Sequence, residues 1–266
     1  MLLSFLLNER RQAHECHRNS RGDFISINGH HRRKKGARSF IALFLNFGVL
    51  FLTIIFMTDP HINPIVLTLL SSAVICSITL FYINGGNVKT VTAFISAMLT
   101  IALLLFFIMA VTKHTSIQGF GEEELGDIGI FTLFVGVDFV KVTAAMIIMG
   151  TIGAITDVAI SITSPMREIY SHNPSMSRKE LYIFGLSIGR DILGTNTNTL
   201  FFAFFGSYLA LIIWFKDLSY SAEKIVNSKV FSAEAVTILC AGIGIGIIIP
   251  VTSWITACFL AKPNKQ

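Results

Sequence analysis

One carboxylate lies inside a long apolar stretch of this 266-residue chain. Asp157 occurs within the run Gly150-Thr-Ile-Gly153-Ala-Ile-Thr-Asp157-Val-Ala-Ile-Ser161-Ile-Thr-Ser164. At helical spacing the two glycines, the aspartate and the two serines of this run fall on one stripe. An ionisable side chain within a membrane helix is costly unless it is paired or hydrated. Asp157 is therefore the first candidate for a functional group.

A second polar stretch, Gly189-Arg-Asp-Ile-Leu-Gly194-Thr-Asn-Thr-Asn-Thr199, opens a later apolar run. Its charged and amide side chains are candidates for helping Asp157 to take up and release a proton or cation: Arg190, Asp191, Asn196 and Asn198. We expect Asp157 and Arg190 to lie within salt-bridge or single-water reach. A structural interpretation is also open, in which hydroxyl groups satisfy Asp157 while Arg190 and Asp191 form a pair at the membrane boundary.

Membrane-spanning helices must position these residues. Hydrophobic residues make up 53% of the chain, charged residues 14%, and the mean hydropathy is +0.67, whereas soluble domains carry about 25% charged residues. A helix needs about 20 mostly apolar residues to cross the hydrocarbon core. Six runs qualify, at about 40–57, 65–83, 90–112, 137–163, 192–215 and 235–260. The expected fold class is all-α, a polytopic membrane bundle of six transmembrane helices.

Basic residues predict how these helices are oriented. Lys and Arg occur in the N-terminal segment, the turn before residue 90, the 165–190 loop and the C-terminal end, whereas Glu122, Glu123 and Glu124 lie between spans three and four. Loops rich in Lys and Arg stay in the cytoplasm. We therefore expect both termini inside and the three glutamates outside. Residues 1–38 are then a basic, disordered cytoplasmic tail, and residues 39–262 form the transmembrane domain.

Local patterns refine the last three spans. Ser177-Arg-Lys-Glu180 is a capping box, and the apolar residues after it recur at helical spacing. This predicts a short amphipathic helix on the inner membrane surface that delivers Arg190 to the membrane. Pro250 removes the hydrogen bond to the carbonyl of Gly246, which predicts a kink or break in span six. The glycine pairs of spans four and six predict close helix contacts: Gly150 with Gly153, and Gly242 with Gly246.

At residues 153–162 and 188–200 the sequence resembles the YibE/YibF family of bacterial membrane proteins, and the resemblance extends from about Asn87 to span six. It implies a multi-pass protein of the bacterial plasma membrane with a transport function. It also implies a partner, either a second six-span YibE-like protein or a second copy of this chain. Because only Thr58 to Pro64 lie between the first two spans, the chain looks like the YibF-like member.

A looser similarity is to the SecF half of RND-type permeases. It rests on an Asp late in span four and an Arg that precedes a Thr/Asn-rich run, as Arg190 does here. Those proteins carry an extracytoplasmic domain between spans one and two, and this chain has only a short turn there. The similarity therefore implies that a substrate-handling domain, if one is used, comes from a partner.

Other functional classes find less support. The cysteines, Cys16, Cys76, Cys240 and Cys258, have neither metal-site spacing nor a disulfide pattern, and no nucleophile–base set suggests catalysis. We expect no catalytic residues, no metal, no cofactor and no nucleic acid, and a lipid bilayer as the surroundings. Two functions stay open. One is a transporter or permease subunit coupled through Asp157, and the other is a non-transporting scaffold or assembly partner of another membrane protein.

Overall fold

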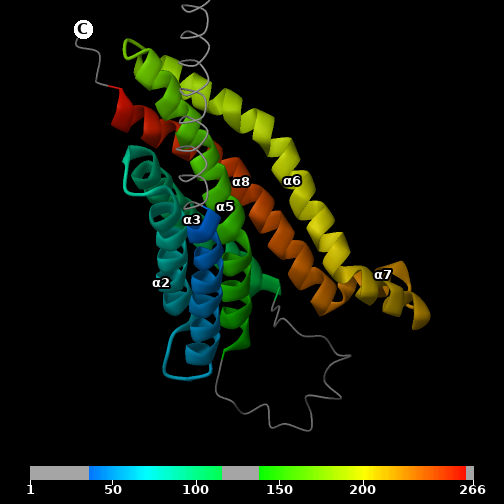
Figure 1. Ribbon diagram of the computed structural model, residues 1–266. Coiled ribbons are helices and arrows are strands. Elements are labelled where there is room, and N and C mark those ends of the chain that lie inside the picture. The colour runs from blue at the N-terminus through cyan, green and yellow to red at the C-terminus, as the bar shows by residue number, and fades with distance from the viewer. Residues whose placement is uncertain (1–35, 116–137, 262–266) are drawn as a thin grey trace, which may run out of the picture.

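The computed structural model describes residues 36–115 and 138–261, and this part of the chain is built from helices (Figure 1). The predicted tail and the Glu122–Glu124 loop lie largely or wholly outside the described residues. Six helices are long and apolar enough to span a membrane, which confirms the predicted fold class. They are Gly36–Met57, α2 (Pro64–Ser77) extended by the π-helical turn η1 (Ile78–Tyr82), α3 (Val88–Thr115), α5 (Phe139–His172), α6 (Arg178–Asp217) and α8 (Lys229–Leu260).

Polar side chains set where these helices begin. Asn63 accepts a hydrogen bond from the Ile65 N–H, with Pro64 at the first position of α2. The predicted capping box is present at the start of α6, where Ser177 and Glu180 satisfy each other's backbone N–H groups. Ser228 caps α8 with its hydroxyl group, which accepts a hydrogen bond from the Phe231 N–H. These caps satisfy donors that a helix would otherwise leave unpaired.

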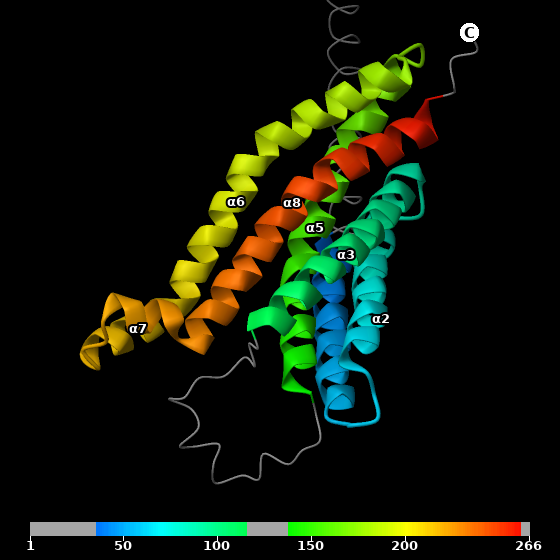
Figure 2. The ribbon, with the colours of Figure 1, turned by 180° about the vertical axis from the view of Figure 1, so that it is seen from behind.

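The helices alternate in direction. The turn at 83–87, the turn at 173–177 and the C-terminal end of α8 lie at one end of the bundle, and the turn at 58–63 lies at the other (Figures 1 and 2). Turns predicted to be cytoplasmic therefore share one end. The assignment of that end to the cytoplasm stays a prediction from the basic residues.

Thiol labelling in intact cells checks the assignment. His61 and Ser175 are both exposed and lie in turns at opposite ends. We expect a membrane-impermeant maleimide to label the His61→Cys variant in intact cells and the Ser175→Cys variant only after permeabilisation. Each variant is the control for the other, and the reverse pattern would show that the orientation is inverted.

α8 packs against α3, α5 and α6. Its side chains Ile245 and Ile248 are fully buried in one apolar cluster with Leu104 of α3 and Ile155 of α5. Gly244 permits this close packing, because a Cβ there would lie 2.8 Å from Leu104 Cδ1 and 3.2 Å from Ile155 Cδ1. The position of α8 therefore sets how α5 and α6, which carry the candidate residues, lie relative to each other.

The predicted surface helix is instead the first part of α6, which runs without interruption from Arg178 to Asp217. Leu181, Gly185 and Gly189 are buried. A Cβ on Gly185 would lie 2.7 Å from both Met166 Sδ of α5 and Ser253 Oγ of α8. The apolar face that we assigned to the membrane surface therefore packs on protein, and α6 has no boundary at Arg190.

Two prolines lie within helices and neither ends one. α8 bends near its C-terminal end but continues through Pro250 (Figures 1 and 2), so the predicted kink is seen without a break. α5 continues through Pro165 to His172, beyond its predicted end near residue 163. Asp157 accordingly lies near the middle of α5 as a helix.

Candidate functional site

The carboxylate of Asp157 lies on the uncovered face of α5. Gly150, Gly153, Asp157 and Ser161 are all exposed, and Ser164 is half-buried. Residues on the opposite face, such as Ile155, are fully buried in the core. The predicted stripe is thus present along one side of the helix. Thr237 of α8 lies beside Gly150 at one end of this stripe, and Gly153 meets no atom of another helix within 4 Å among the described residues.

The described residues offer Asp157 no partner. Their ion pairs are Asp138–Lys141 at 3.1 Å and Glu168–His172 at 3.4 Å, and no hydrogen bond to the Asp157 carboxylate is found in ranges 36–115 and 138–261. A charged group in the middle of a membrane helix is costly without a partner or water. Asp157 therefore requires a proton, a cation, water or a group from another chain.

The two members of the predicted ion pair lie beside nearby positions along α8. Ile155 of α5 lies beside Gly244 of α8, and Gly189 of α6 lies beside Ile249 of α8. Relative to α8, α5 runs parallel and α6 runs antiparallel (Figure 1). Counting residues from these contacts places the aspartate and the arginine level with the same turn of α8.

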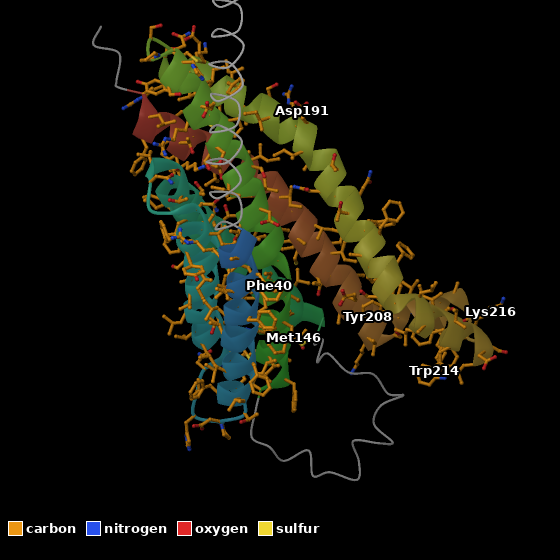
Figure 3. All side chains as sticks on the ribbon, viewed as in Figure 1. Phe40, Met146, Asp191, Tyr208, Trp214 and Lys216 are labelled. Carbon is orange, nitrogen blue, oxygen red and sulfur yellow. The ribbon has the colours of Figure 1, made fainter. Side chains whose placement is uncertain are left out.

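Arg190 nevertheless points away from the core. Ile188 and Ile192 of α6 pack against the apolar cluster, and Arg190, two residues from each, lies on the opposite side of the helix and is exposed. Figure 3 shows the neighbouring Asp191 on the outer side of α6. The structure contains no Asp157–Arg190 ion pair in the chain it describes, and a water-bridged pair stays a prediction.

The two predicted amides occupy different environments. Asn196 is half-buried and Asn198 is exposed. Both lie on the same helix as Arg190 and Asp191, within two turns of them. α6 therefore presents two charged groups and one amide to its surroundings, close to the depth of Asp157.

The closest helix contacts are at glycines that the sequence analysis did not single out. At Gly150 a Cβ would lie 3.3 Å from Thr237 Cγ2, but at Gly153, Gly242 and Gly246 it would meet no atom of another helix within 4 Å. The predicted contacts at those three glycines are therefore not formed in the described chain. The tight positions are Gly185, Gly189 and Gly244. The sequence did indicate the face of α6 that carries two of them, because Leu181, Gly185 and Gly189 repeat every four residues.

A polar cavity of about 260 Å³ lies at the end of the bundle that holds the 58–63 turn. Its lining includes His61, Asp138 and Lys141. Burial acts to raise the pKa of Asp138, but hydrogen bonds from the side chain and backbone N–H of Lys141, together with the charge of Lys141, hold this pKa below its ordinary value. Asp138 caps α5. We therefore assign this ion pair to anchoring the start of α5.

Buried hydroxyl groups form a row on each of the packed helices α3 and α8, and we call the two rows the hydroxyl seam. Thr92, Ser96 and Thr100 repeat every four residues on α3, and Thr252 and Thr256 do so on α8; all are fully buried. The hydroxyls of Thr100, Thr252 and Thr256 have no partner among the described residues. The sequence analysis missed this seam, although its four-residue spacing is visible in the sequence.

Comparison with known protein families confirms the resemblance to the YibE/YibF family. Residues 24–262 match the family model described as YibE/F-like protein. No curated protein and no solved structure matches the chain.

Proposed function

The chain belongs to the YibE/F-like protein family, and from that membership and the placement of Asp157 we propose that it is the transporting subunit of a plasma-membrane permease. The observation that carries the proposal is a carboxylate near the middle of a spanning helix, exposed and without a partner in the described chain. Intramembrane ionisable residues commonly mark ion and proton pathways. Asp157 is the group that takes up and releases the coupling proton or cation.

The polar part of α6 supports this role. It begins close to the position of Asp157 along α8 and offers amide and guanidinium groups, which stabilise an ionised carboxylate when they approach it. The small residues beside Asp157 leave room for water or an ion next to the carboxylate. In this mechanism, relative movement of α5 and α6 changes the proton or cation affinity of Asp157 between two states.

The alternative function is a non-transporting scaffold, and one observation favours it. The contacts at Gly185, Gly189 and Gly244 hold α8 tightly against its neighbours, as a static packing element requires. In that case the stripe of α5 only binds another protein. The two functions differ in whether the carboxylate must ionise.

Flux measurements separate these functions. Protein purified in mild detergent, with whatever co-purifies, is reconstituted into liposomes that contain a pH-sensitive dye, and proton entry is followed after a potassium diffusion potential is imposed. A parallel series replaces the potassium diffusion potential by a sodium gradient across the liposome membrane. We expect Asp157→Asn to reduce flux to the level of protein-free liposomes, because an amide cannot release a proton.

Glu168→Gln is the matched control, because it makes the same chemical change at an exposed position of the same helix. It should retain the wild-type flux. Wild-type flux from Asp157→Asn, or no flux from the wild type in either series, contradicts the proposal. Failure of Asp157→Asn to assemble with its co-purifying partner, with normal helix content by circular dichroism, supports the scaffold.

A further inference from the structure

The hydroxyl seam contains three buried side chains that lack a hydrogen-bond partner. Thr100, Thr252 and Thr256 are each 0% exposed, and their hydroxyl groups bond to none of the described residues. The neighbouring Ser96 and Ser253 each donate to the carbonyl four residues earlier in their own helix, at 2.7 Å. A buried hydroxyl group without a partner is unfavourable, because its lost bonds to water are not replaced. The three threonines therefore require a partner that the helices do not supply.

The three hydroxyl groups lie along one helix interface. Gly244 of α8 lies beside Leu104 of α3, and α8 ends at the end of the bundle where α3 begins (Figures 1 and 2). From this contact, steps of four residues toward that end lead to Thr252 and Thr256 on α8 and to Thr100 on α3. Such steps stay on the same face of a helix. The threonines therefore line the face on which α3 and α8 meet.

We propose that the hydroxyl seam binds a file of water molecules between α3 and α8. Threonines one turn apart on a helix have Cβ atoms about 5–6 Å apart, and one water molecule about 2.8 Å from each hydroxyl oxygen bridges this distance. Thr252 and Thr256 are such a pair. Thr100 adds a partner from the facing helix, and buried water requires about two to four polar partners.

The chemistry of the seam favours water over a metal cation. Its polar side chains are neutral, and the described residues contain no group of three or more His, Cys, Asp or Glu side chains that could hold a metal ion. A cation among neutral groups would keep its charge in an apolar core, at high cost, whereas water both donates to and accepts from a hydroxyl group. The buried residues Ala93, Ala97 and Ala257 beside the seam are small, which leaves room for water.

Bound water makes the seam an inlet into the helix bundle. α3 begins at Val88, and Thr100 lies about 18 Å along the helix from there at 1.5 Å per residue. Beyond Thr100, the side chains of Leu104 and Ile155 close the seam beside Gly244. Asp157 lies on the opposite face of α5 from Ile155, so this inference does not depend on the proposed role of Asp157.

Removal of single hydroxyl groups tests the proposal in the full-length protein. Thr252→Val and Thr256→Val keep the branched shape of the side chain and remove its oxygen. If water binds these groups, its hydrogen bonds are lost, and the midpoint of thermal unfolding in mild detergent should fall by about 2–4 °C in each variant. Midpoints equal to or above that of the wild type overturn the proposal, because removing an unpartnered buried hydroxyl group relieves a cost.

Thr112→Val is the matched control. Thr112 is also 0% exposed on α3, but its hydroxyl group donates to the Ile108 carbonyl of its own helix at 2.9 Å. Its replacement should therefore change the midpoint less than the seam variants do. The double variant T252V/T256V should lose less than the two single losses combined, because both hydroxyl groups bind the same water. Additive losses overturn the shared bridge.

X-ray radiolysis followed by mass spectrometry detects the water in the wild type, because hydroxyl radicals formed from bound water oxidise the side chains beside it. Ile248 lies between Gly244 and Thr252 on the seam face of α8 and is 0% exposed. It should be oxidised faster than Ile147 of α5, which is 1% exposed in the same apolar cluster, and more slowly in Thr252→Val. Equal oxidation of the two isoleucines in the wild type overturns the proposal, even where the valine variants fail to fold.

Discussion

Gly189→Ala is expected to destabilise the protein by about 1–3 kcal/mol or more through overpacking. The added Cβ would overlap Cγ2 of Ile249 and lie 3.1 Å from both Cβ and Cγ1 of Ile249. A rotamer change of Ile249 can move Cγ2, but a β-branched side chain has one strongly preferred rotamer in a helix, and the Cβ of Ile249 stays fixed to the backbone of α8. α6 and α8 must move apart, which weakens the contact that holds α6 in place. Thermal unfolding in detergent measures the loss.

Two further variants test whether the overlap with Ile249 causes this loss of stability. Gly206→Ala makes the same change on α6 where no atom of another helix lies within 4 Å. It should be neutral or stabilising, because alanine favours a helix over glycine by up to about 1 kcal/mol. Ile249→Ala removes Cγ1 and Cγ2 and leaves only the Cβ contact at 3.1 Å, so adding it to Gly189→Ala should cost less than the two separate losses combined. Additive losses would contradict the predicted overlap.

Gly244→Leu is expected to prevent stable folding, whereas Gly246→Leu is tolerated. A Cβ at Gly244 already meets Leu104 and Ile155 at 2.8 and 3.2 Å, and at Gly246 it meets no atom of another helix within 4 Å. Three further carbon atoms at Gly244 have no space between α3, α5 and α8. The cost exceeds the range of about 1–3 kcal/mol for modest overpacking, a large part of a stability of about 5–15 kcal/mol.

The yield of monodisperse protein after detergent extraction measures this difference. Gly244→Ala belongs in the same series and should lose less stability than Gly189→Ala, because the nearest atom to it is the flexible end of Leu104. Equal yields of Gly244→Leu and Gly246→Leu would show that α8 does not pack on α3 and α5 in this rotation.

Run length and charge were sufficient to predict the six spans, because each apolar run is bounded by polar turn residues such as Asn63 and Ser177. The start of the helix that contains span five was predicted incorrectly, because one helix begins at Arg178 in place of two. The polar run from Arg190 to Thr199 looks like a membrane boundary in the sequence, but α8 lies beside the helix throughout this run. The backbone therefore stays helical through it.

The candidate site was predictable in part. Spacing alone places Asp157 on a stripe of small residues, and that stripe is present in α5. The side toward which Arg190 points depends on how α6 rotates to bury Leu181, Gly185 and Gly189, and this rotation is set by contacts with other helices. The rotation of α8 could not be predicted from the sequence either, and it places Gly244 against α3 and α5 while Gly246 lies on an uncovered side. Sequence periodicity finds faces but does not say which neighbour each face meets.

Because α6 is one uninterrupted helix, a tilt at one end moves the other end. The 40 residues of α6 correspond to a length of about 60 Å at 1.5 Å per residue. From the tight contact at Gly185 and Gly189 to Trp214 is about 40 Å on the same scale. Each degree of tilt about that contact therefore displaces the Trp214 end by about 0.7 Å. A separate surface helix would have absorbed such motion in a flexible joint, whereas one hydrogen-bonded helix transmits it to the opposite side of the bilayer.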